Sequence, residues 1–133
     1  MKRLMRVAET INNIDSIINK ILDNPESSNI IINYIDEYCE DNISEIYEKN
    51  NGNLTADDIF ESIEKDLRDT NKLNDFVEKF LDLTENDVLS DELYNSQDGK
   101  EKLAEELIEK YYSTIENVLL EQIKIEEEIH SEY

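Results

Sequence analysis

The segment NNGNLTADDI, residues 50–59, contains the clearest structural boundary in the sequence. Gly52 suits the left-handed backbone position that commonly follows a helix, so a helix should end just before it. Thr55 suits the N-cap of a following helix, and Asp58 stands where a capping box usually has Glu. Apolar residues on either side of this turn have the spacing of a hydrophobic staple. The segment therefore predicts two helices joined by a short polar loop.

Apolar residues upstream of this loop recur at steps of three and four, which is typical of amphipathic helices. The pattern predicts helices over residues 3–23 and 27–49, and Pro25 ends the first because it disfavours helical geometry in the residue before it. The first stripe resembles a coiled-coil heptad. It consists of Leu4, Val7, Ile11, Ile14, Ile18 and Ile21.

The same helical spacing continues downstream of the loop. A third helix should begin at Ala56, and a fourth should follow a break near residues 69–71. The segment LTENDV, residues 83–88, repeats the start signal with Thr84 as the expected N-cap of a short fifth helix. After a loop over residues 95–99, one long helix is expected over residues 100–131. Its apolar stripe is Ala104, Ile108, Tyr111, Ile115, Val118, Ile125 and Ile129.

The composition agrees with an all-α fold. The chain has only two glycines and one proline among 133 residues, which leaves few tight turns for a β-sheet protein. A chain of this length fits one domain. We therefore expect a single acidic α-helical domain over residues 1–133, a compact bundle of five to six helices with long N- and C-terminal helices. Those two end helices are expected to pack together or to form a homodimer.

The net charge of −21 is the strongest functional signal in the sequence. Residues 1–24 carry four cations and three carboxylates, so the acidic excess lies in residues 25–133. Direct binding of nucleic acid requires a basic surface, and anionic membranes would repel this chain. A basic protein would be attracted at long range. We therefore expect a protein partner, without direct nucleic-acid binding and without membrane binding.

The cysteine content and the hydropathy of the chain indicate the cellular compartment of the protein. Cys39 is the single cysteine, so no internal disulfide can form, which fits a reducing cytoplasm. No apolar run approaches the ~20 residues of a membrane span, and the N-terminal residues are too polar for a signal-peptide core. The bias toward Ile, Asn, Lys, Glu and Tyr suggests an AT-rich genome, bacterial or phage. A cytoplasmic protein is expected.

The sequence contains no complete catalytic or metal-binding motif. Glu127 and His130 have the spacing of a di-iron ligand pair, but such a site needs a second histidine. Cys39 fits a small core residue better than a nucleophile, because its only histidine partner would be His130. The polar loops lack the EF-hand pattern, and two glycines cannot form a phosphate-binding loop. We expect no catalytic residues, no metal, no cofactor and no enzyme activity.

Rows of carboxylates are the remaining candidate for a functional site. They step by three or four residues along three expected helices, which places neighbours about 5–6 Å apart, close to the spacing of phosphates along a nucleic-acid strand. Any amphipathic helix in an acidic protein shows such rows on its solvated side, but few lysines stand four residues away to neutralise these. The candidate partner-binding residues are Glu37, Asp41, Glu45, Glu48, Asp57, Asp58, Glu61, Glu64, Glu101, Glu105, Glu109 and Glu116.

These features lead to one functional hypothesis and two alternatives. The chain would inhibit a basic nucleic-acid-binding protein or nuclease by mimicking the nucleic-acid backbone. In general character it resembles the phage-encoded DNA mimics and anti-CRISPR proteins, which are small, acidic and often helical, although no motif carries that resemblance. The first alternative is an immunity protein or antitoxin against a basic nuclease toxin. The second is a structural or adaptor protein that assembles through its apolar stripes.

Overall fold

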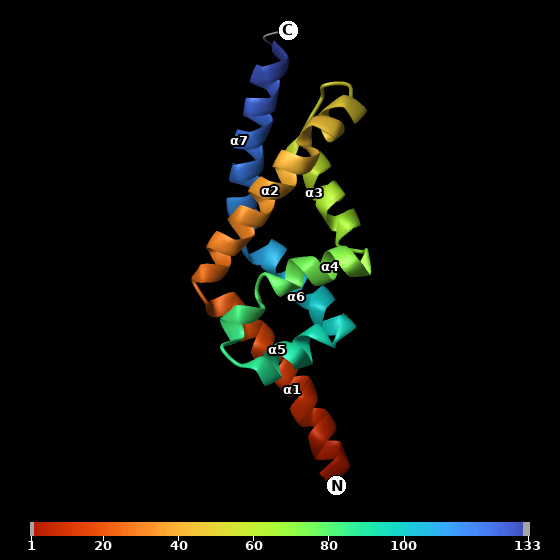
Figure 1. The fold of residues 1–133 in the computed structure, drawn as a ribbon, viewed down its shortest axis with the longest axis vertical. Coiled ribbons are helices and arrows are strands. Elements are labelled where there is room, and N and C mark those ends of the chain that lie inside the picture. The colour runs from red at the N-terminus through yellow and green to blue at the C-terminus, as the bar shows by residue number, and fades with distance from the viewer. Residues whose placement is uncertain (1, 132–133) are drawn as a thin grey trace.

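The computed structural model describes the backbone of residues 2–131 and the side chains of residues 13–131. Over these residues the chain forms seven α-helices and one 3-10 turn, without a strand, which confirms the all-α fold (Figure 1). In chain order they are α1 (Lys2–Asp23), α2 (Glu26–Lys49), α3 (Ala56–Asp66), α4 (Thr70–Glu78), the 3-10 turn η1 (Leu81–Thr84), α5 (Asp87–Tyr94), α6 (Gln97–Lys110) and α7 (Tyr112–Ser131).

The helices pack in two groups that share one hydrophobic core. At one end of the molecule α7 runs along α2, and α3 packs beside both (Figure 1). At the other end α1 packs against α5, α6 and η1, and α4 lies on α6. The largest fully buried side chains come from both groups, and Phe76 of α4 and Phe80, just before η1, lie among them. The core therefore joins the two ends into one bundle.

The loop before α3 is built as its sequence predicts. Gly52 has a φ of +83°, in the left-handed region that favours glycine. The Thr55 side chain accepts a hydrogen bond from the backbone N–H of Asp58, and the Asp58 carboxylate accepts one from the backbone N–H of Thr55. This reciprocal capping box satisfies two backbone donors at the start of α3. Leu54 and Ile59, the expected hydrophobic staple, are both buried.

The predicted N-cap of the fifth helix, Thr84, is wrong. Thr84 is not an N-cap: it ends η1, is fully buried, and its hydroxyl donates to the carbonyl oxygen of Leu81 and contacts the Ser90 hydroxyl. Asn86 caps α5 instead, because its side chain accepts from the backbone N–H groups of the following turn. The left-handed Glu85 between them, with a φ of 56°, provides the extra turn that displaces the helix start.

The expected loop over residues 95–99 is shorter than predicted. Ser96 is the N-cap of α6, and its hydroxyl accepts a hydrogen bond from the backbone N–H of Gly99 at 3.0 Å. Gly99 therefore lies in the first turn of α6, where it is buried against Ile14 of α1. A glycine that normally signals a loop here permits close contact between two helices.

The long helix expected over residues 100–131 is divided at Tyr111, which is why the bundle has seven helices rather than five or six. The backbone leaves helical geometry at this residue, with φ −102° and ψ 20°. The Tyr111 hydroxyl bonds to Ser27 at the start of α2, and the Lys110 ammonium donates to the carbonyl oxygen of Leu22 in α1. Contacts with the α1–α2 turn, which local sequence does not reveal, hold the break in place.

The division at Tyr111 also changes how the end helices pack. The two long helices that pack together are α2 and α7, whereas α1 packs chiefly against α5, α6 and η1, so the expected packing of the end helices within one chain is wrong. The alternative that they form a homodimer stays a prediction. The buried face of α7 has a different register from the predicted stripe, and Ile125 and Ile129 remain about half exposed. In α1, Ile18 and Ile21 are buried as predicted. The predicted positions before residue 13 lie outside the described side chains.

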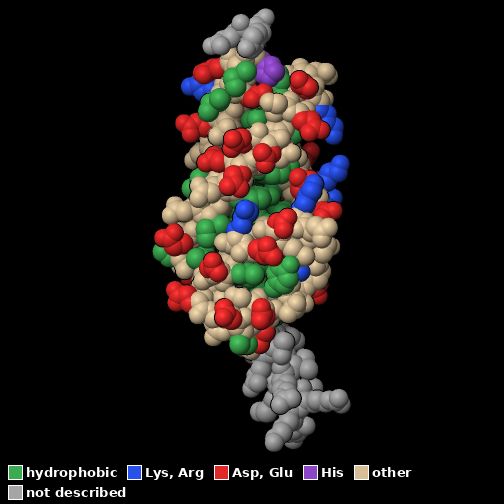
Figure 2. Space-filling model, in the orientation of Figure 1, with side chains coloured by type: hydrophobic (Ala, Val, Ile, Leu, Met, Phe, Trp, Pro, Cys, Tyr) green, Lys and Arg blue, Asp and Glu red, His purple; other side chains and the backbone are tan. Residues whose placement is uncertain are grey.

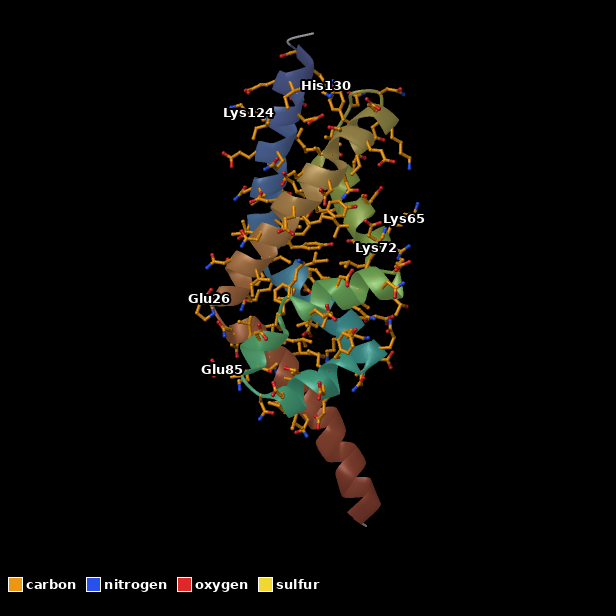
Figure 3. All side chains as sticks on the ribbon, viewed as in Figure 1. Glu26, Lys65, Lys72, Glu85, Lys124 and His130 are labelled. Atoms are coloured by element: carbon orange, nitrogen blue, oxygen red, sulfur yellow. The ribbon has the colours of Figure 1, made fainter. Side chains whose placement is uncertain are left out.

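A polar cluster closes the free end of the α2–α7 pair. The carboxylate of Glu126 is buried, accepts a hydrogen bond from the Ser44 hydroxyl at 3.0 Å and contacts Nε2 of His130 at 2.9 Å. The His130 ring stacks on Tyr47 with 4.0 Å between ring centroids, at the end of α7 (Figure 3). His130 therefore helps to fix α7 on α2, and its acidic contact is Glu126 rather than the Glu127 singled out from the sequence.

Candidate partner-binding groove

The twelve candidate carboxylates are divided between two grooves and positions outside both. Four of them line a groove between α3, α4 and α6, which we call the acidic groove. Three others line a second groove between α2 and α3, which we call the mixed groove. The remaining five line neither of these grooves. They are Glu37, Asp41, Glu48, Asp57 and Glu116.

The acidic groove has a volume of about 600 Å³ and combines an apolar floor with a charged rim. It is lined by Glu64, Leu67, Arg68, Leu73, Glu101, Ala104, Glu105, Ile108, Glu109 and Tyr112. The four carboxylates oppose a single guanidinium, so the lining has a formal charge of −3. All four carboxylate side chains belong to exposed residues, whereas the leucines and Ala104 are buried beneath them. This arrangement offers charge and apolar area to the same ligand.

The pattern of α6 explains why its carboxylates stand at the rim. Leu103, Ala104 and Leu107 are buried and face the core. Glu101, Glu105 and Glu109 are four residues apart and therefore form a row along the edge of that buried face. The row extends about 12 Å along the helix at 1.5 Å per residue. The buried and charged positions of one helix thus become the floor and rim of one groove.

The lysines of α6 do not neutralise this row, because each has a partner elsewhere. Lys100 is buried, donates to Oδ1 of Asn74 at 2.6 Å and lies over the ring of Tyr94. Lys102 pairs with Asp15 of α1 at 2.8 Å, and this hydrogen bond raises the pKa of Lys102 above its ordinary value. Lys110 donates to a backbone carbonyl of α1. None of these three lysines therefore pairs with a carboxylate of the row.

An aromatic stack closes the groove on the side of α7. The rings of Phe60 and Tyr112 lie 4.7 Å apart at an interplanar angle of 8°. Phe60 is buried, whereas Tyr112 is 43% exposed at the groove. A stacked, half-exposed tyrosine provides rigid apolar area beside a polar hydroxyl, a combination common in protein interfaces.

The mixed groove is smaller and nearly balanced in charge. It has a volume of about 440 Å³, and its carboxylates include the candidates Glu45, Asp58 and Glu61. Three lysines line it as well, namely Lys49, Lys65 and Lys72, and the latter two lie close together at one edge of the molecule (Figure 3). With Asp66, four carboxylates oppose three ammonium groups, which leaves −1. The mixed groove therefore attracts a cation less than the acidic groove does.

The other candidates are spread over the surface. Glu37 forms an exposed ion pair with Lys79 at 3.8 Å, and within the described side chains it is the one candidate carboxylate in a salt bridge. On the face drawn in Figure 2, Asp and Glu side chains are spread over the whole described part, while several Lys and Arg side chains lie along one edge. Of the two grooves, the acidic groove therefore holds more of the candidate carboxylates and the larger formal negative charge.

Sequence reasoning missed the apolar half of the groove. Ala104, Ile108 and Tyr112 stand three residues after Glu101, Glu105 and Glu109 respectively, so an apolar row beside the acidic row was already visible in the sequence. The opposite wall, from the end of α3 and the start of α4, carried no such signal, because only the tertiary fold brings it against α6.

The described residues contain neither a metal site nor a membrane span. Among them, no group of three or more His, Cys, Asp or Glu side chains has an arrangement that could hold a metal ion. No helix within residues 2–131 combines the length and apolar character needed to cross a bilayer. Comparisons with protein-family models, with curated proteins and with solved structures gave no match to this chain.

Proposed function

We propose that this protein binds a basic nucleic-acid-binding protein or nuclease and inhibits it by occupying the surface that would otherwise hold nucleic acid. The observation that carries this proposal is the unneutralised row of Glu101, Glu105 and Glu109 beside the apolar floor of the acidic groove. The proposed setting is a reducing cytoplasm, and the proposed source is a phage that evades host defence, as an anti-CRISPR protein does.

The charge of the molecule supports this proposal in two ways. A net charge of −21 attracts a basic partner from a distance and raises the association rate. At contact, carboxylates about 6 Å apart along α6 can replace successive phosphates in the basic channel of the partner. An immunity protein that neutralises a basic nuclease toxin would use the same surface, so that alternative shares the physical basis of the proposal.

A capture experiment tests the proposal. The protein is immobilised, exposed to bacterial lysate at low salt, and eluted first with duplex DNA and then with a salt gradient. We expect nucleic-acid-binding proteins to be retained and then released by the DNA, because both ligands compete for one basic surface. Purified captured proteins should lose DNA binding or cleavage when the inhibitor is added.

Matched charge reversals provide the control. The groove variant carries Glu101→Lys, Glu105→Lys and Glu109→Lys, and it should retain none of these proteins. The control variant changes three exposed carboxylates on other elements, Glu40, Glu85 and Glu127, to Lys. It has the same net charge and should still retain them. Equal loss in both variants, or elution by salt but never by DNA, would contradict the proposal.

A second candidate function is an adaptor that assembles with other helices. Three large apolar residues of α7 favour it, since Leu120, Ile125 and Ile129 are 51%, 49% and 48% exposed. Such side chains commonly mark contact surfaces when they gather on one element. An adaptor should lose its partner when Ile125 and Ile129 become Asn, and should keep it when the groove carboxylates are reversed. The inhibitor should behave in the opposite way.

A further inference from the structure

The apolar floor of the acidic groove goes beyond what phosphate mimicry needs. A mimic that acts by charge alone requires only spaced carboxylates on a solvated surface. Here the partly exposed side chain of Ile108 lies among the carboxylates, and Tyr112 stands beside it on its stack with Phe60, above the buried Leu67, Leu73 and Ala104. Burial of apolar area contributes about 25 cal/mol per Å². A ligand that fills the floor would therefore bind more tightly than a simple polycation.

We infer that the acidic groove binds an amphipathic basic helix of the partner protein, with apolar side chains of that helix on the groove floor and its Lys or Arg side chains on the glutamate row. This inference rests on the proposed function, because it specifies how the basic partner is recognised.

Helical spacing in the ligand matches the row on α6. Glu101, Glu105 and Glu109 repeat every four residues, or about 6 Å along the axis. Cations at every fourth position of a partner helix that lies along α6 would repeat at the same distance. Apolar residues three positions from those cations would then project toward Ala104 and Ile108. An amphipathic helix in a groove is a common recognition mode in which apolar anchors give most of the affinity.

The opposite rim makes the recognition directional. The wall opposite the glutamate row carries one carboxylate and one guanidinium, Glu64 and Arg68, so the lining is negative on one wall and formally neutral on the other. A partner helix with cations on one flank and a neutral or acidic residue on the other would fit both walls. A uniformly basic ligand would gain no net attraction from the wall of Glu64 and Arg68, which separates this ligand class from polyamines and oligolysine.

Titration of three peptides by calorimetry tests the inference. The first is a helix-forming Leu/Lys peptide of about 18 residues, long enough to form a helix, with lysine at every fourth position along one flank. The second has the same composition in scrambled order, and the third is oligolysine of equal charge. We expect the amphipathic peptide to bind about tenfold more tightly than either control, a difference of about 1.4 kcal/mol. Amide chemical shifts should change mainly in α4, α6 and the end of α3.

Variants assign the affinity to the two parts of the groove. Replacing Glu101, Glu105 and Glu109 with Gln should weaken the amphipathic peptide about tenfold, and Gln at Glu40, Glu85 and Glu127 should change it less than about threefold. Ile108→Asn should weaken that peptide several-fold and leave oligolysine unaffected. If this variant loses its fold, the shift mapping on the unmodified protein decides the question.

The outcomes separate failure of the inference from failure of the proposed function. Equal affinity for all three peptides, or shift changes centred outside the acidic groove, overturns the inference while a charge-based inhibitor remains. No measurable binding of any basic peptide at low salt overturns both. Preference for the amphipathic peptide together with loss in the groove variant supports the inference.

Discussion

Gly99 shows how a single residue can determine helix packing. A Cβ atom at this position would lie 2.9 Å from Oγ of Ser96 and 3.1 Å from Cγ2 of Ile14. The first contact is part of the N-cap of α6, and the second belongs to the α1–α6 interface. Gly99 therefore lets α1 approach the first turn of α6 while Ser96 keeps its capping hydrogen bond.

Gly99→Ala should destabilise the protein by about 1–3 kcal/mol, because overpacking at a close helix contact exceeds the gain in helix propensity. In an exposed helix interior the same change would stabilise by about 1 kcal/mol, so the sign of the effect is informative. Urea unfolding measures it. Gln97→Ala, at an exposed neighbouring position, is the control and should change stability by less than about 0.5 kcal/mol. An unchanged or increased stability of Gly99→Ala would refute the close contact.

Cys39 gives the stability a dependence on alkaline pH. Burial, and then the nearby charge of Asp36, raise the pKa of its thiol to about 12. In the unfolded chain the thiol ionises near its ordinary value of about 8.5. Between these two values the unfolded chain releases a proton that the folded chain retains, so stability falls as pH rises. Burial likewise raises the pKa of Tyr38 to about 12, which adds to the decline above pH of about 10.

Urea unfolding of the unmodified protein and of Cys39→Ala at several pH values tests this account. The variant should be less stable at neutral pH because it leaves a cavity. Its stability should decline less steeply between about pH 8 and 10, because it lacks the buried thiol. Parallel curves for the two proteins would show that Cys39 does not retain its proton in the fold.

Among the helices, the break at Tyr111 between α6 and α7, which we call the joint, decides how α7 packs. Without a break at Tyr111, the last helix would run straight from the acidic groove and would not lie along α2. The fully buried Ser27 hydroxyl donates to the carbonyl oxygen of Asn24 and contacts the Tyr111 hydroxyl. Since Ser27 has only one proton, Tyr111 serves as the donor to Ser27. The hydroxyl pair thus ties the joint to the start of α2.

Tyr111→Phe should cost about 1 kcal/mol of stability, because the change leaves a buried acceptor on Ser27 without its donor. Its neighbour provides a matched control, since Tyr112→Phe removes a hydroxyl from a side chain that is 43% exposed. That control should change stability by less than about 0.5 kcal/mol. Equal effects of the two variants in thermal or urea unfolding would mean that the hydroxyl pair does not hold the joint.

Helix boundaries could be read from the sequence where local chemistry decides them. Thr55 and Asp58 cap α3 through neighbours within three residues, so their pattern was sufficient. Thr84 has a similar local pattern, yet the left-handed Glu85 and the hydroxyl contact with Ser90 draw it into the core. The joint at Tyr111 depends on Ser27, which is 84 residues away in the sequence. The spacing of apolar residues along the sequence cannot predict contacts between residues so far apart.

In the whole molecule, the tertiary fold distinguishes carboxylates that the sequence pattern treats as equivalent. The twelve candidate carboxylates looked equivalent in their rows, but four line the acidic groove and three share the mixed groove with lysines. The difference arises because Lys100, Lys102 and Lys110 have their partners on α4 and α1 rather than in the row on α6. Only the tertiary structure shows which carboxylates remain free to act together.

The most direct test of the account is the salt dependence of affinity for a nucleic-acid-binding protein recovered by capture. The logarithm of its affinity is measured against the logarithm of salt concentration for three proteins: the unmodified protein, the variant with Gln at Glu101, Glu105 and Glu109, and the control with Gln at Glu40, Glu85 and Glu127. The account predicts weaker binding and a shallower slope for the groove variant alone, because close charge pairs are lost. Identical affinities and slopes for the two variants would contradict a role of the acidic groove in binding.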